Sequence, residues 1–201
     1  MAPLSLRSWA DVARHPLLPR VLAVTVIMAS GQFAVFAFIA PYLLWLIGAD
    51  ANGRALALAW IGAFGLIGNL AVARFIDRLG SDRAAHLTLA AMLAGITLMP
   101  AGHASVALAA VAMTAWGLGI FGSNSAQQVR LAEIAPPLAS ASIALNTSAI
   151  YLGQAIGTAG GGLVYAHAGV GWLSWFGTAL VAAAIAISVC VARRRKKLGP
   201  V

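Results

Sequence analysis

The chain has 201 residues, of which 61% are hydrophobic and 9% are charged, and its mean hydropathy is +0.90. This composition excludes a soluble domain of the ordinary kind, in which about 25% of residues are charged. The formal net charge is +8, but the basic residues lie beside long apolar runs, and no polar domain is available to form a nucleic-acid surface. We therefore expect an all-α membrane protein.

Six long apolar runs follow one another along the chain, and we expect each of them to be a transmembrane helix. A helix rises 1.5 Å per residue, so roughly 20 residues cross a hydrocarbon layer about 30 Å thick. The runs are Leu17–Gly48, Ala55–Ile76, Ala84–Ala101, Val106–Val129, Leu138–Ala166 and Val170–Ala192. The predicted regions are a cytoplasmic lead at 1–16, a six-helix transmembrane domain at 17–192 and a basic cytoplasmic tail at 193–201.

The Lys and Arg residues fall almost entirely in alternate gaps between these runs. All of the 13 except Arg54 lie in or beside four of these gaps: before the first run or in its first turn (Arg20), between the second and third or in the last turn of the second (Arg74), between the fourth and fifth, or after the sixth. Positive residues in short loops are retained on the cytoplasmic side of a membrane. Both termini are therefore predicted to be cytoplasmic, and an even number of spans agrees with this.

The acidic residues lie outside the apolar runs or at their ends. They are Asp11, Asp50, Asp77, Asp82 and Glu133. The four histidines show no ligand spacing, and a single cysteine excludes an intrachain disulfide. We therefore expect no enzyme activity, no metal and no cofactor.

Uncharged polar residues inside the runs are the candidate functional residues, because a polar side chain in hydrocarbon is costly without a partner. Helical spacing in the fifth run forms a polar stripe of Thr147, Tyr151, Gln154 and Thr158, and a neighbouring stripe of Asn146, Gly153, Gly157 and Gly160. Such glycines let another helix approach closely. The polar stripe is expected either to line a cavity or to bond a neighbouring helix, and the pattern leaves both open.

The first and fourth runs supply further candidates. Gln32 and Phe36 share a face of the first run, and Trp116, Ser123 and Gln127 share a face of the fourth. A lining of aromatic, amide and methionine side chains suits a neutral or amphipathic small molecule better than a simple ion. Ordinary packing or lipid contact is the competing interpretation for the apolar members.

Two segments carry a family resemblance. The second gap reads Asp77-Arg78-Leu79-Gly80-Ser81-Asp82-Arg83, in which Gly80 permits a tight turn and Asp77 can form a charge cluster with Arg78 and Arg83. This resembles the Asp-Arg-x-Gly cytoplasmic loop signature of the major facilitator superfamily. Residues 123–129 and 139–157 are similar to spans ten and eleven of bacterial drug, sugar and nucleoside efflux carriers of that superfamily.

The resemblance covers nearly the whole chain and implies the C-terminal six-helix half of such a carrier, with residues 1–20 similar to the end of the central linker. It implies two inverted three-helix repeats, with the first and fourth spans lining the substrate cavity. Gln32, Trp116, Ser123 and Gln127 would then face the substrate. The fifth span would flank the opposite half, so that its glycine stripe would contact a helix that this chain lacks.

The expected function is transmembrane transport of a small organic molecule, and the resemblance implies efflux across a bacterial inner membrane. The chain would be a half-transporter that needs a second six-helix half, either another copy or a separate N-terminal-half chain. The alternative is a non-transporting truncated remnant or accessory membrane subunit, in which the same residues are structural. The expected partners are a small-molecule substrate and the lipid bilayer, with no nucleic acid.

Overall fold

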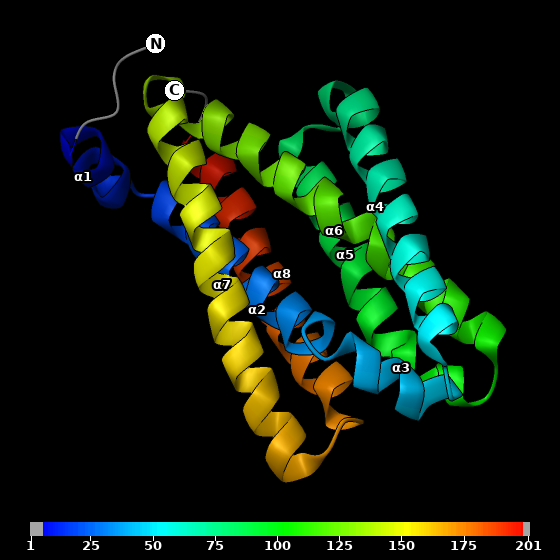
Figure 1. The fold of residues 1–201 in the computed structure, drawn as a ribbon. Coiled ribbons are helices and arrows are strands. Elements are labelled where there is room, and N and C mark those ends of the chain that lie inside the picture. Colours follow the sequence, from blue (N-terminus) through cyan, green and yellow to red (C-terminus); the bar gives the residue numbers. More distant parts are fainter. Residues whose placement is uncertain (1–5, 199–201) are drawn as a thin grey trace.

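The computed structural model describes residues 6–198, and this part of the chain is all-helical (Figure 1). The elements are α1 (Leu6–Arg14), α2 (Leu18–Phe36), α3 (Ile39–Ile47), α4 (Ala51–Leu79), α5 (Ser81–Leu98), η1 (Met99–His103), α6 (Val106–Ile134), η2 (Pro136–Leu138), α7 (Ala139–Ala168) and α8 (Trp172–Leu198). The long helices lie side by side in an elongated bundle. Residues 1–5 of the predicted lead and 199–201 of the predicted tail lie outside the described residues.

Five segments of the described chain are long and apolar enough to cross a membrane. They are Leu18–Phe36, Ala51–Leu79, Ser81–His103, Val106–Ile134 and Trp172–Lys197. The prediction of a helical membrane protein is thus confirmed. The helix α7 is 30 residues long but is not in this group, because amides, hydroxyls and glycines make it less apolar. That α7, the fifth apolar run, spans the membrane stays a prediction.

The first predicted span is two helices rather than one. α2 ends at Phe36, and α3 begins at Ile39 after a short break. Pro41 has no backbone N–H, so it cannot bond the carbonyl of Ala37 and continue α2 as one helix. As the third residue of α3, it lies in a first turn, where the N–H groups have no partner within the helix and the missing donor costs little. α3 then ends at Ile47 and is capped by Gly48, whose φ of 63° is the left-handed conformation that glycine adopts readily.

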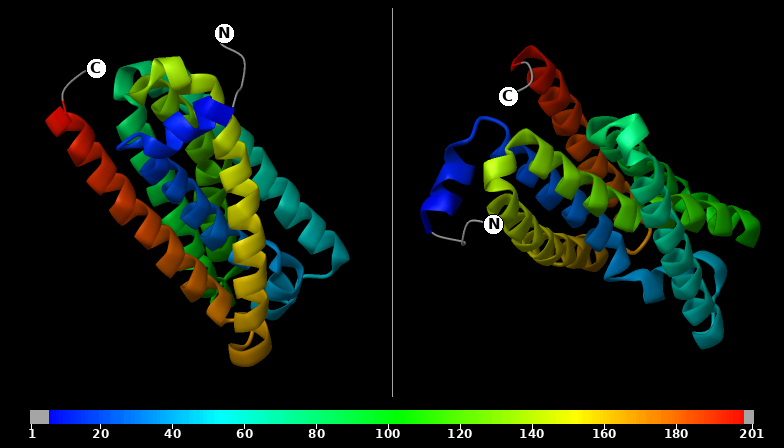
Figure 2. Two further views of the ribbon diagram at one scale, coloured as in Figure 1. Left: turned by 90° about the vertical axis from the view of Figure 1, so that its left-hand side faces the viewer. Right: turned by 90° about the horizontal axis from the view of Figure 1, so that it is seen from above.

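The bundle has two chemically different ends. The start of α2, the α4–α5 and α6–α7 junctions and the last turns of α8 lie together, and we call this the basic end (Figures 1 and 2). α3, η1 and the α7–α8 turn lie at the opposite end. There the ring centres of Trp45 and His103 are 4.1 Å apart. Arg54 lies in the first turn of α4, near α3. The alternation of basic residues is therefore an alternation between two ends of one bundle.

The glycines of α7 allow it to lie directly against α2. A Cβ atom added at Gly153, Gly157 or Gly161 would come within 3.0 Å of the carbonyl oxygens of Val26, Ser30 and Ala34 respectively. Real Cβ atoms do not approach this closely, so the two backbones are in contact only because these residues are glycine.

This contact corrects the prediction that the glycine stripe meets a helix absent from the chain. The helix that it meets is α2 of the same chain. Gly160 is also displaced from the contact, since its nearest neighbours are ring atoms of Phe176 at 3.2 Å, and Gly161 occupies the place on α2. A strict four-residue spacing keeps the glycines on one line of the helix, and Gly160 falls to one side of that line.

The other interfaces of the bundle use the same device. Gly68 of α4 lies against the backbone of Leu118 in α6, and Gly95 of α5 lies against the backbone of Trp116, also in α6. Gly31 of α2 and Gly177 of α8 face each other across a third interface. α2 and α6 are therefore the two helices on which the others pack.

Replacing Gly157 with alanine should destabilise the bundle by about 1–3 kcal/mol, because the added methyl group forces α7 away from α2. The matched control is Gly162→Ala on the same helix, where the new Cβ would meet only the Phe38 ring at 3.5 Å, an ordinary contact. We expect this control to equal or exceed the wild type in stability. The measurement is unfolding of the purified protein in detergent micelles. Equal stability of Gly157→Ala and the wild type would contradict the α2–α7 contact.

Candidate functional site

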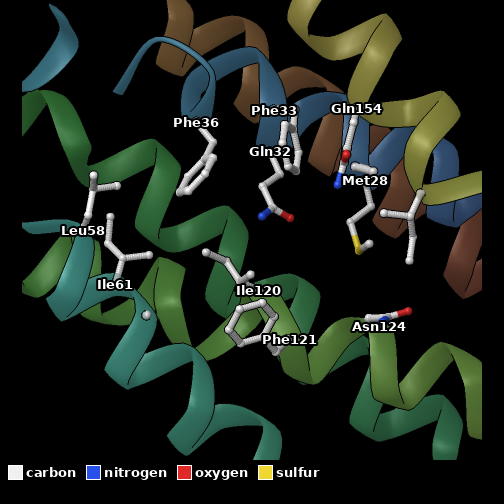
Figure 3. Close-up of a pocket in the computed structure, with 13 residues that line it drawn as sticks. Met28, Gln32, Phe33, Phe36, Leu58, Ile61, Ile120, Phe121, Asn124 and Gln154 are labelled. Carbon is white, nitrogen blue, oxygen red and sulfur yellow. The ribbon is translucent and has the colours of Figure 1, made fainter. Parts of the chain in front are cut away.

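A pocket with a volume of about 360 Å³ lies between α2, α4, α6 and α7 (Figure 3). This volume is within the range of small-molecule sites. Three carboxamides line it, Gln32, Asn124 and Gln154, together with three phenylalanines, Phe33, Phe36 and Phe121. The remaining lining residues are Met28, Gly62 and five aliphatic residues, Ala29, Leu58, Ile61, Ile120 and Ile150. No charged side chain is present among the lining residues.

The helix contacts explain how these side chains come together. Met28, Gln32 and Phe36 are spaced four residues apart, so α2 presents them on one face. Gln154 directly follows Gly153, and the close contact of Gly153 with α2 turns Gln154 toward the side of α2 that carries Gln32. α6 contributes Ile120 and its neighbours from the opposite wall.

The carboxamide of Asn124 is held by a chain of hydrogen bonds behind the pocket. The Thr25 hydroxyl donates to Asn146 Oδ1 at 2.7 Å, and Asn146 Nδ2 donates to Asn124 Oδ1 at 3.0 Å. Gln128 Nε2 also donates to this oxygen, at 3.4 Å. With its oxygen occupied, Asn124 has its NH₂ group left to donate to a ligand.

The side-chain amides of the two glutamines in the pocket can each donate or accept hydrogen bonds with a ligand. Within residues 6–198, neither the Gln32 nor the Gln154 amide has a hydrogen-bond partner. Each offers one acceptor and two donors. Together with the Phe33 and Phe36 rings, these groups can bind an uncharged molecule that carries both hydroxyl or amide groups and an apolar face.

Of the predicted cavity residues, Gln32, Phe36 and Gln154 line the pocket. Trp116 does not, but its fully buried ring packs edge-on against Phe36 with the ring centres 6.1 Å apart, behind the pocket wall. Ser123 is also buried and donates to the Ile120 carbonyl at 3.0 Å.

Three further predicted cavity residues lie elsewhere. Gln127 is fully buried beyond the pocket, and in the part of the chain that the structure describes neither of its amide atoms has a hydrogen-bond partner. Thr147 is exposed and bonds only the Ile143 carbonyl of its own helix. Tyr151 is 65% exposed.

The polar stripe of α7 therefore divides between the two interpretations that the sequence left open. Gln154 lines the cavity, while Thr147 and Tyr151 point out of the bundle. Asn146, from the neighbouring stripe, bonds both Thr25 of α2 and Asn124 of α6. It therefore joins three helices.

Asn124 was not among the predicted cavity residues, but in the structure it lines the pocket. The phenylalanines Phe33 and Phe121 and the α4 residues Leu58 and Ile61 were not predicted either. Ser123 and Gln127, four residues apart, lie on the buried face of α6. The pocket lies at the edge of that face. The four-residue spacing of Ile120 and Asn124 was the available signal.

The loop motif forms a tight turn, and its ion pairs centre on a different acid. Gly80 separates α4 from α5 with a φ of 79°. Asp82 binds Arg130 Nε at 2.6 Å and Arg195 at 3.5 Å. Asp77, Arg78 and Arg83 are exposed, and none of them forms an ion pair with any residue in 6–198.

Arg130 ties three helices together at the basic end. Its side chain is fully buried, and besides Asp82 of α5 it bonds Ser188 of α8, donating to the hydroxyl at 2.9 Å and to the carbonyl at 3.1 Å. Arg195 of α8 extends the cluster to Glu133 at 2.9 Å. The buried charge of Arg130 is thus paired with Asp82, and two of its five N–H donors bond Ser188.

Asp82→Asn should destabilise the protein by about 3 kcal/mol, because it leaves the buried Arg130 without a compensating charge. The matched control is Asp77→Asn, which removes the same charge one turn before the same junction. Since Asp77 is exposed and unpaired within 6–198, we expect a change within about 0.5 kcal/mol. Unfolding in detergent micelles measures both. A cost at Asp77 equal to that at Asp82 would contradict the cluster.

The fold and the pocket together define a class, an all-helical membrane protein with an uncharged pocket of small-molecule size. Compared with protein-family models, the chain matches none.

Proposed function

We propose that the chain is a half-transporter, a six-helix membrane subunit that forms one wall of the path of a small uncharged organic molecule and works with a second six-helix half. The observation that carries this proposal is the pocket among α2, α4, α6 and α7, whose carboxamides Gln32 and Gln154 have no partner within 6–198. Unbonded polar groups in a bundle interior point to a ligand, since hydrocarbon offers them nothing.

The proposal requires α7, which corresponds to the fifth apolar run, to cross the membrane as well. At 30 residues it is about 45 Å long, which is enough to cross a bilayer. The residues that make it less apolar do not all face lipid. Asn146 is fully buried, Gln154 lines the pocket, and Gly153 and Gly157 contact α2.

The helix packing supports two inverted three-helix repeats. α2 packs on α7 and α8, α6 packs on α4 and α5, and α5 meets α8. This pattern is unchanged when α2 is exchanged with α6, α4 with α7, and α5 with α8. The glycine contacts follow the same exchange, since α7 lies on α2 as α4 lies on α6. Inverted repeats of this kind are common in secondary transporters, and the major facilitator resemblance implies them.

The remaining parts of the proposal concern orientation and coupling. The basic end faces the cytoplasm by the positive-inside rule, and export across a bacterial inner membrane follows from the family resemblance. The pocket has no acid in its lining, so any proton-coupling carboxylate belongs to the second half. That half is another copy of the chain or a separate N-terminal-half chain.

Transport tests the pocket. Protein reconstituted in liposomes should support counterflow of at least one neutral probe from a set of radiolabelled sugars and nucleosides, including uridine and glucose. Gln32→Leu and Gln154→Leu should each lower the rate about tenfold, the loss expected for one or two hydrogen bonds. The matched control is Thr147→Val, which removes a polar group from the exposed face of α7 and should leave the rate within twofold.

Two results would contradict this assignment. An equal loss in Thr147→Val would mean that the pocket does not determine the rate. The alternative of a non-transporting remnant or accessory subunit would be favoured if no probe showed counterflow, either with the chain alone or with a co-expressed N-terminal half. The unfolding of the Gly157→Ala and Gly162→Ala variants shows in that case that the protein is folded.

Oligomeric state tests the requirement for a second half. In lipid nanodiscs or by single-molecule photobleaching in liposomes, the active species should contain two copies, or one copy bound to a co-expressed N-terminal half. A strictly monomeric chain that catalyses counterflow alone would overturn the half-transporter proposal while leaving the pocket in place.

A further inference from the structure

A second hollow lies at the basic end, between the start of α2 and the last turns of α8, with a volume of about 370 Å³. Arg20 of α2 lines it, together with Ala186, Ile187, Cys190, Val191 and Arg194 of α8. We call it the α2–α8 groove. Two arginines lie at its end and small apolar side chains form its wall.

α8 carries two different faces at this level. Ser188 and Arg195, seven residues apart, face Arg130 and the ion cluster. Cys190 and Arg194, four residues apart, line the groove. A step from Arg195 to Arg194 turns the side chain by about 100° around the helix. The groove therefore lies on a face of α8 different from that of the ion cluster.

The acids near the basic end leave the groove unneutralised. Asp82 and Glu133 already pair with Arg130 and Arg195, and no acid lines the groove. Arg20 donates to the neutral Pro16 carbonyl, and Arg194 forms no ion pair with residues 6–198. The α2–α8 groove thus presents two positive charges without an internal counter-charge.

We propose that the α2–α8 groove binds one anionic phospholipid, with its phosphate between Arg20 and Arg194 and an acyl chain along Ala186, Ile187 and Cys190. Both helices are long and apolar enough to cross a membrane, so their ends lie at the level of the lipid headgroups and the apolar wall below lies in hydrocarbon. Guanidinium groups match phosphate oxygens in geometry as well as charge. Basic pockets between helix ends are recognised sites for anionic headgroups.

A phospholipid fits this groove better than a soluble phosphate does. Ala186 and Cys190 are exposed and apolar, and they continue away from the two arginines toward the middle of α8. An inorganic anion would use only the arginines and leave this wall uncovered, whereas an acyl chain covers it. The site is separate from the carboxamide-lined pocket and does not depend on transport.

The experiment is native mass spectrometry of the full chain in detergent containing equal amounts of phosphatidylglycerol and phosphatidylcholine. The wild type should retain one phosphatidylglycerol in clear preference. Each arginine at the surface is worth about a fivefold change in affinity, so Arg20→Gln with Arg194→Gln should lower the preference about 25-fold. The matched control is Arg193→Gln with Lys196→Gln, which removes the same charge from exposed positions of α8 outside the groove and should stay within twofold.

Two further measurements separate the lipid from a free anion. Cys190→Phe fills the apolar wall at an exposed position without altering charge, and it should lower phosphatidylglycerol retention as well. Excess inorganic phosphate should leave retention unchanged. The proposal is overturned if the control pair lowers the preference as much as the arginine pair, if Cys190→Phe has no effect, or if inorganic phosphate displaces the lipid.

Discussion

Backbone contact at glycine is the constraint on which the rest of this structure depends. Helices in a bilayer gain nothing from leaving lipid as such, so their association relies on close packing and on hydrogen bonds between them. Here α7 and α8 lie on α2, and α4 and α5 lie on α6, each through glycines that leave no room for a side chain. These contacts set the separation and rotation of every helix that lines the pocket.

The pocket lies where this close packing stops. α2 and α6 collect the contacts of the other helices but touch each other little, and large side chains such as Phe36 and Phe121 occupy the faces between them. Phenylalanine and glutamine cannot interlock as glycine and alanine do, so a hollow remains. The same rotation of α7 that places Gly153 on α2 places Gln154 at this hollow. Packing and the candidate site are therefore two consequences of one helix orientation.

The helical fold could be predicted because apolar runs and alternating charge are properties of single segments. The glycine stripe of α7 could also be predicted from the sequence, but the helix that it contacts could not. Residue spacing identifies one face of a helix and does not identify the helix that packs on that face. The ion cluster shows the same limit. Asp77 and Asp82 lie on either side of Gly80, yet only Asp82 reaches Arg130, and that depends on how α5 and α6 cross. Asn124 was missed because adjacent residues of α6 point in different directions. Ser123 is buried in the core, while Asn124 lines the pocket.

The scarcity of acids finally explains how charge is arranged along the bundle. With 5 acids against 13 Lys and Arg residues, internal pairing can neutralise only part of the positive charge. The acids Asp82 and Glu133 are used where the need is greatest, beside the fully buried Arg130. Arg20 and Arg194 are exposed and can obtain counter-charge from outside the protein. In a membrane the available source at the ends of the helices is the lipid headgroup, whereas the polar lining of the pocket among α2, α4, α6 and α7 is uncharged carboxamides.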